Sequence, residues 1–282
     1  MNKTIAFFDS GIGGIPYLIH LKNIKPDLNY VYLADNANFP YGIKNGEVIK
    51  EIVLSAIDRL IKKITPDVIV IACNTATVVT LPYLREKFTI PFVGVVPAVK
   101  PAASMSENKR IGLFATNKTV SDSYTDNLIA QFAGNCEVHK YADPNIVSFI
   151  ENKMFESENK EILEFLIPAA NFFIEKDVDH VVLGCTHFLF IHDMLENLFP
   201  EKIKTIDSRE GVSRQVLRII SDMDVAPHAS QGWRSAWGKD MAVASQSVKR
   251  DRDCFYVTSS NINNDYYKKI ADRFMLKYSG II

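Results

Sequence analysis

The sequence predicts an α/β protein with two similar lobes, each a mainly parallel sheet flanked by helices, related by a pseudo-twofold axis with the active site in the cleft between them. Strand-like and helix-like segments alternate over about the first 200 residues, which is typical of parallel sheets with covering helices. Two buried-type apolar runs, 68–72 and 181–184, each end in a cysteine and two polar residues. The order of segments also begins again after Lys109, which indicates a weak internal duplication.

The first lobe is predicted from a regular series of segments. In the stretch 46–64, apolar residues recur at helical spacing from Ile49 to Ile64 and charged residues occupy the other face. Short apolar runs bounded by polar or turn residues predict the strands. The expected strands are 5–8, 30–33, 68–72 and 91–96, and the expected helices are 15–24 and 46–64.

The second lobe is predicted to begin near Pro97 and Pro101. A strand at 110–115 ends in Thr116-Asn117-Lys118-Thr119, much as the first strand ends in Asp9-Ser10-Gly11, and the second cysteine run follows it. The strand-like residues 254–258 have no partners of their own, so we expect them to return to the first lobe. The predicted division is 1–97 plus 207–282 for the first lobe and 98–206 for the second.

Composition and charge exclude several classes of protein. The 282 residues include 32 basic and 33 acidic side chains, a formal charge of −1, so no long-range field favours nucleic acid or an anionic membrane. No apolar stretch approaches the roughly 20 residues of a membrane span, and residues 1–4 run directly into a strand without a signal peptide. We therefore expect a cytoplasmic protein, and a homodimer, that binds neither nucleic acid nor membrane.

The stretch 223–253 differs in character from the rest of the chain. It is rich in Ser, Ala, Gln and Gly, has little periodicity and carries Trp233 and Trp237. A surface excursion is the simpler interpretation, and a partner or subunit contact through the tryptophans is the alternative.

Cys73 and Cys185 are the strongest candidates for chemistry. Each is expected at the carboxyl end of a strand and the amino end of a helix, where α/β sheets bind ligands and where backbone amides lower the pKa of a thiol. Cys136 and Cys254 lack this setting, so we interpret them as small apolar residues. The four cysteines form no CxxC pair, which argues against a zinc site or a disulfide framework. His187 is either a core histidine or, as we favour, a group that relays the proton of Cys185.

Two further turns carry candidate ligand groups. Residues 9–14, Asp-Ser-Gly-Ile-Gly-Gly, follow the first strand, but Pro16 replaces the third glycine of a dinucleotide fingerprint and Asp9 would face the pyrophosphate. The carboxylate of Asp9 suits an ammonium group instead. In the turn 39–42, Tyr41 could offer a phenol and Gly42 a backbone amide to a ligand.

Four motifs together resemble the glutamate racemases of the aspartate/glutamate racemase superfamily: 9–11, 40–42, 72–76 and 184–187. The resemblance covers about residues 5–220 and resumes at 255–258. It implies a cofactor-independent enzyme with one cysteine from each lobe, which supplies D-glutamate for peptidoglycan. By position, the acid/base residues would be Cys73 and Cys185, assisted by Asp9 and His187. The substrate-binding residues would be Asp9, Ser10, Tyr41, Gly42, Asn74, Thr75, Thr186 and His187, with Thr119 and Glu151 lining the cleft.

Inversion at an α-carbon needs a base on one face and an acid on the other, and two thiols provide both. No lysine accompanies the motifs to bind pyridoxal phosphate, and no ligand cluster suggests a metal. A thiol hydrolase using Cys185 and His187 would leave Cys73 without a role. An aspartate racemase, another thiol enzyme of the superfamily and a two-lobed amino-acid-binding protein without catalysis remain alternatives.

Overall fold

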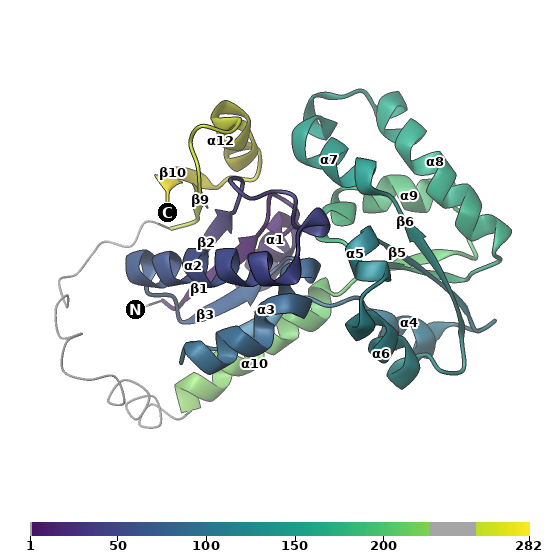
Figure 1. Ribbon diagram of the computed structural model, residues 1–282, viewed down its shortest axis with the longest axis horizontal. Helices are drawn as coiled ribbons and strands as arrows, with labels where there is room; N and C mark the ends of the chain where they lie inside the picture. The colour runs from purple at the N-terminus through teal and green to yellow at the C-terminus, as the bar shows by residue number, and fades with distance from the viewer. Residues whose placement is uncertain (1, 226–251) are drawn as a thin grey trace.

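The computed structural model describes residues 2–225 and 252–282 and contains two separate parallel sheets (Figure 1). The first has the strand order β10-β9-β2-β1-β3-β4 and the second the order β6-β5-β7-β8. All the paired strands are parallel, so the predicted fold class is confirmed. The tryptophans Trp233 and Trp237 lie outside the described residues. The strands are β1 (Thr4–Asp9), β2 (Asn29–Ala34), β3 (Val68–Ile71), β4 (Phe92–Gly94), β5 (Arg110–Ala115), β6 (Glu137–Ala142), β7 (His180–Leu183), β8 (Lys204–Ile206), β9 (Cys254–Val257) and β10 (Lys277–Ile281).

The central strands of the first sheet are buried on both faces. Phe7 of β1 belongs to one apolar cluster and Phe8 to another, because successive side chains of a strand point to opposite faces. Helices cover both faces, which explains why these strands are continuous apolar runs rather than alternating ones. The helices of this lobe are α1 (Ile15–Ile24), α2 (Gly46–Ile64), α3 (Asn74–Lys87), α10 (Arg209–Val225) and α12 (Asn264–Arg273).

Local sequence fixes the ends of the longest of these helices. The side chain of Asn45 accepts a hydrogen bond of 2.9 Å from the backbone N–H of Glu47 and so caps α2 at its start. Thr65 ends the helix in the left-handed conformation, with φ of 51°. The predicted bounds of 46–64 are confirmed.

Further helices flank the second sheet. They are α4 (Val99–Met105), α5 (Asn117–Val120), α6 (Ser123–Phe132), α7 (Pro144–Asn152), α8 (Asn159–Glu175) and α9 (His192–Leu198). The core of this lobe is continuous with that of the first, because one cluster of buried apolar side chains includes both Ile12 and Phe188. The two lobes therefore pack against each other rather than only being connected by the chain.

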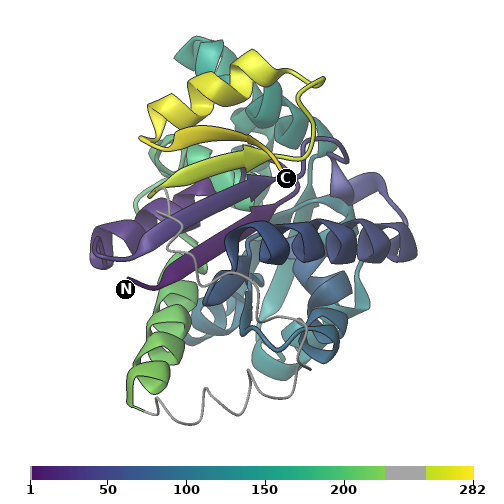
Figure 2. The same cartoon turned by 90° about the vertical axis from the view of Figure 1, so that its left-hand side faces the viewer.

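The chain returns to the first sheet after the second lobe. Helix α10 lies against α1, and β9 pairs with β2 in parallel register, so the expected return at 254–258 is confirmed. Figure 2 shows β9, β10 and α12 together at one edge of the first sheet. The division into 1–97 plus 207–282 and 98–206 stays a prediction. None of the helices in the described part of the chain has the length and apolar character that crossing a membrane demands.

Candidate active site

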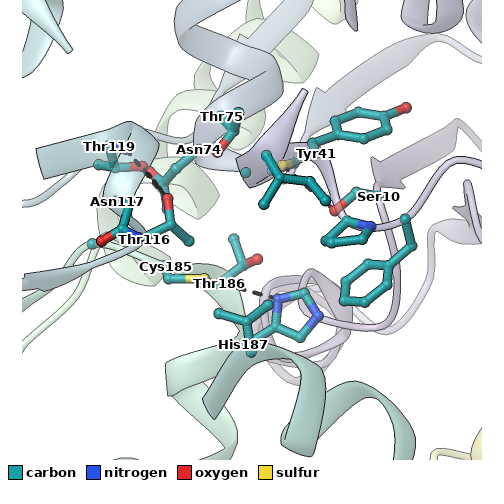
Figure 3. A pocket seen from close by; sticks show the side chains of 17 residues that line it. Ser10, Tyr41, Asn74, Thr75, Thr116, Asn117, Thr119, Cys185, Thr186 and His187 are labelled. Atoms are coloured by element: carbon teal, nitrogen blue, oxygen red, sulfur yellow. Dashed lines mark hydrogen bonds between the residues drawn. The ribbon is translucent and has the colours of Figure 1, made fainter. Parts of the chain in front are cut away.

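One pocket lies where the carboxyl ends of the strands of both sheets meet (Figure 3). Both candidate cysteines line it. Cys73 follows β3 in the first lobe, and Cys185 follows β7 in the second. The first lobe also contributes Ser10, Phe39, Pro40, Tyr41, Gly42, Ile43, Asn74 and Thr75, and the second contributes Thr116, Asn117, Thr119, Val147, Gly184, Thr186 and His187. The structure thus brings together nearly all the residues that the sequence singled out.

Cys73 is itself the N-cap of α3. Its Sγ atom accepts a hydrogen bond of 3.5 Å from the backbone N–H of Ala76 and lies 3.8 Å from the hydroxyl of Ser10. The expected lowering of the thiol pKa is nevertheless wrong for this residue. Burial raises the pKa of Cys73, and the negative charge of Asp9 raises it further, because together they outweigh the two hydrogen bonds that favour the thiolate.

Cys185 is the N-cap of a 3₁₀ helix, Thr186–Ile191, so the helix start expected at this cysteine is confirmed. Its Sγ atom lies 3.9 Å from Nδ1 of His187, and Nε2 of His187 is 2.7 Å from the Glu151 carboxylate. Burial alone would lower the pKa of His187, but the hydrogen bonds to Cys185 and Glu151 raise it well above its ordinary value. The structure therefore favours a protonated imidazole next to the Cys185 thiol.

Glu151 lies behind His187 and is not among the residues that line the pocket, contrary to expectation. Its side chain, on α7, is only 1% exposed. Besides His187, its carboxylate accepts hydrogen bonds from the backbone N–H of Ile12, at 2.9 Å, and from the hydroxyl of Tyr267, at 2.5 Å. These three donors come from separate parts of the chain, so Glu151 connects both lobes and the C-terminal helix α12.

Asp9 is also fully buried behind the pocket wall. Its carboxylate accepts hydrogen bonds from the backbone N–H of Gly11, at 3.0 Å, and from the Thr186 hydroxyl, at 3.1 Å. Burial raises the pKa of Asp9 from 3.8 to about 6, although His187 and the Gly11 amide oppose the shift. Asp9 therefore joins the turn of the first lobe to the cysteine motif of the second.

The glycines after Asp9 are needed for space rather than for an unusual backbone angle, since of the described glycines only Gly280 has a positive φ. A Cβ atom on Gly13 would lie 2.5 Å from both Nδ1 of His187 and Oγ1 of Thr186. A Cβ atom on Gly11 would collide with the Glu151 carboxyl group. The glycine-rich turn thus lets the first lobe approach the cysteine motif of the second.

Asn74 presents a buried acceptor without a partner. Its side chain is 4% exposed, and among the described residues nothing donates a hydrogen bond to its Oδ1 atom. A buried unpaired carbonyl oxygen is costly, so Asn74 Oδ1 is available to a hydrogen-bond donor that enters the pocket.

The hydroxyl of Tyr41, by contrast, already donates to the Asp35 carboxylate at 2.5 Å. Asp35 also accepts hydrogen bonds from Asn38 and Thr258, so this loop is anchored to the end of β9. The phenol expected to face a ligand instead fixes the loop that carries Gly42.

Several residues that line the pocket were not proposed as site residues from the sequence. Thr116 and Asn117 directly follow β5, the strand of the second lobe that corresponds to β1, and this correspondence could have identified them. Thr116 caps α5 by accepting a hydrogen bond from the backbone N–H of Thr119 at 3.2 Å. Ile43 and Val147 carry no comparable signal, because ordinary apolar residues reach the pocket only through tertiary packing.

Within residues 2–225 and 252–282, no group of three His, Cys, Asp or Glu side chains is placed to hold a metal ion. The model of the Asp/Glu/Hydantoin racemase family matches residues 20–212. The chain is 40% identical to a glutamate racemase of Shewanella sp. (strain MR-7) over 225 residues, 79% of this chain and 81% of that protein. It is 39% identical to a glutamate racemase of Yersinia enterocolitica over 222 residues, 78% of this chain and 77% of the relative.

The structure is similar to that of Escherichia coli glutamate racemase solved with L-glutamate and the activator UDP-MurNAc-ala. The TM-score is 0.81 at 29% identity, covering 100% of this chain and 97% of that one. The cysteine pair, the shared pocket and these similarities agree with one another: the chain belongs to the Asp/Glu/Hydantoin racemase family and, within it, to the glutamate racemases.

Proposed function

We propose that the protein interconverts L-glutamate and D-glutamate without a cofactor, by a two-cysteine acid/base mechanism, and so supplies D-glutamate for peptidoglycan synthesis. The observation that carries this proposal is the pair of thiols, one from each lobe, on the wall of a single pocket. A hydrolase needs only one of them. Relatives named glutamate racemase support glutamate as the substrate, and so does the L-glutamate bound to the Escherichia coli relative.

In the proposed reaction one cysteine removes the α-proton as a thiolate and the other returns a proton to the opposite face as a thiol. By analogy with the family, Cys73 takes the proton from D-glutamate and Cys185 takes it from L-glutamate. Asp9 and His187 assist these two thiols. The negative charge that develops on the substrate carboxylate is stabilised by neutral donors of the pocket, in a cleft that excludes water. The proposed substrate-binding residues are Ser10, Gly42, Asn74, Thr75, Thr119 and Thr186.

The unpaired acceptor of Asn74 suggests how the substrate is oriented. The ammonium group is the only strong hydrogen-bond donor of a glutamate zwitterion, since both carboxylates accept. We therefore place the ammonium group against Asn74 Oδ1, with Asp9 providing negative charge behind the pocket wall. This arrangement leaves the hydroxyls and amides of the site to the carboxylates.

The decisive experiment uses a β-chloro analogue of glutamate, because its elimination requires only the first proton transfer. Removal of the α-proton expels chloride and gives an enamine, which hydrolyses to a 2-oxo acid and ammonia. Cys73→Ser and Cys185→Ser are each expected to abolish racemisation of glutamate, followed by circular dichroism. Each variant should keep elimination from one enantiomer and lose it with the other.

Identical behaviour of the two variants toward both enantiomers would favour a single base and contradict the mechanism. Faster racemisation of aspartate than of glutamate by the wild-type protein would move it to a sister activity, and binding without racemisation would support the amino-acid-binding alternative. The homodimer and the cytoplasmic location expected from the sequence stay predictions.

A further inference from the structure

We propose that Tyr267, on the C-terminal helix α12, is a positioning residue for the Cys185 side of the reaction, acting through Glu151 and His187. This inference rests on the proposed function and extends it to a part of the chain outside the two cysteine motifs. Tyr267 does not line the pocket. Its effect on the reaction is transmitted by a continuous series of buried polar contacts.

The series runs from the edge of the first sheet to the second thiol. The Tyr267 hydroxyl donates to Oε1 of Glu151 at 2.5 Å, Oε2 of Glu151 is 2.7 Å from Nε2 of His187, and Nδ1 of His187 is 3.9 Å from Sγ of Cys185. The side chains of Tyr267, Glu151 and His187 are at most 3% exposed. Each contact is therefore shielded from water, and solvent does not readily replace a lost partner.

Tyr267 determines how the Glu151 carboxylate is turned. The terminal torsion of a glutamate side chain has only broad preferences, so its hydrogen-bond partners set the orientation of the two oxygens. Tyr267 holds Oε1, which directs Oε2 toward His187 and the backbone N–H of Ile12. Without the tyrosine hydroxyl, Oε1 has lost this donor and the carboxylate can rotate or shift away from His187.

The Tyr267 hydroxyl also affects the charge of His187, because it contacts the carboxylate of Glu151. It donates to the same carboxylate whose hydrogen bond helps to raise the pKa of His187 beside Cys185. Loss of this donor perturbs both the charge and the position of His187. On the other side of the pocket, Cys73 contacts Ser10 and Ala76 rather than this series. The effect should therefore be largest in the steps in which Cys185 transfers the proton.

The chain offers a matched pair of conservative variants. Tyr267→Phe removes the hydroxyl and keeps the ring, which lies 6.3 Å from the ring of Phe255. The neighbouring Tyr266 is also buried on α12, but within the described ranges its hydroxyl has no hydrogen-bond partner. Tyr266→Phe thus removes the same atom from the same helix without removing a hydrogen bond to Glu151.

The experiment compares wild type, Tyr267→Phe and Tyr266→Phe in elimination from each enantiomer of the β-chloro analogue. The enantiomer that depends on Cys185 is identified as the one that Cys185→Ser fails to process. For Tyr267→Phe we expect kcat for elimination from that enantiomer to fall about tenfold, with KM little changed. Elimination from the other enantiomer should stay within about twofold of wild type. Tyr266→Phe should match wild type with both, and thermal unfolding should show that both variants fold.

An equal loss with both enantiomers would show a purely structural role, and no loss in a folded Tyr267→Phe protein would also overturn the proposal. A second measurement does not depend on activity. The ¹⁵N resonances of the His187 ring, assigned by their absence in His187→Asn, should move in Tyr267→Phe and stay in place in Tyr266→Phe. If wild type fails to racemise glutamate, the proposed function fails, whereas unmoved His187 resonances refute the role of Tyr267 alone.

Discussion

The close approach of Gly13 to Thr186 and His187 of the second cysteine motif leads to a quantitative prediction. Gly13→Ala adds one methyl group to a turn whose backbone angles already suit alanine, so any effect comes from the space that the methyl group occupies. That group would lie 2.5 Å from Nδ1 of His187 and from Oγ1 of Thr186. Neither of these atoms belongs to the free end of a long flexible side chain. His187 is held by Glu151, and Thr186 is held by Asp9.

The size of the effect follows from these distances. Ordinary contact with a Cβ atom begins at 3.4 Å, so the His187 ring and the Thr186 side chain have to retreat by about 0.9 Å. A displacement of about 1 Å at a reacting group costs on the order of 100-fold in rate, or about 2.7 kcal/mol of activation free energy. Overpacking of this kind also lowers the free energy of unfolding by about 1–3 kcal/mol. We therefore expect kcat/KM for glutamate to fall about 100-fold in a protein that still folds.

The assay follows racemisation of each enantiomer by circular dichroism, together with chemical unfolding. Gly211→Ala is the matched control, because a Cβ atom there meets nothing within 4 Å and alanine favours a helical position such as this one in α10. It should leave kcat/KM unchanged. A folded Gly13→Ala protein with wild-type kcat/KM would refute the argument that a side chain at position 13 displaces His187 and Thr186.

Two further predictions concern Asp9 and the absence of a cofactor. Folding raises the pKa of Asp9 from 3.8 to about 6, so the protonated form favours the folded state and stability is lost as pH rises through this window. Asp9→Asn stays neutral, so at pH 8 it should exceed wild type in free energy of unfolding by up to about 3 kcal/mol while losing activity, and the two should converge by pH 4 in urea titrations. Equal stability at pH 8 would contradict the shift. Racemisation should also persist after exhaustive treatment with EDTA and with hydroxylamine, and activity that returns only with added metal or pyridoxal phosphate would refute a cofactor-independent mechanism.

Local patterns in the sequence were sufficient for the elements that place the thiols. The helices 15–24 and 46–64 and the strand 110–115 have the predicted bounds, because helical spacing, caps and apolar runs are encoded within each segment. The sequence also placed each cysteine at the carboxyl end of its own strand. The two strands belong to different sheets, so the shared pocket was predicted from the matching settings of the two cysteines and not from a common sheet edge.

The polar contacts behind the pocket could not be predicted in this way. Glu151 and Tyr267 are separated by 116 residues, and their contact depends on how the two lobes and the C-terminal helix pack. The raised pKa of Cys73 depends on depth of burial and on the position of Asp9. Neither property can be inferred from the residues next to the cysteine. Local sequence favoured the helix start, which lowers a thiol pKa, but burial has the larger effect here.

The two halves of the site differ in charge although the lobes are similar. Cys185 lies beside a histidine whose pKa is raised, whereas Cys73 is buried near a carboxylate that opposes its ionisation. Because the two enantiomers of glutamate have equal free energies, the proposed reaction must have the same kcat/KM from either one, so Cys73 has to act as a thiolate in one direction. Of the described side chains lining the pocket, His187 is the only basic one, and its ring lies against Cys185. We therefore propose that the substrate ammonium group offsets the charge of the Cys73 thiolate, so that substrate binding precedes ionisation of Cys73. The same burial that makes this thiolate costly to form also makes it a strong base, and a strong base is what removal of a weakly acidic α-proton requires.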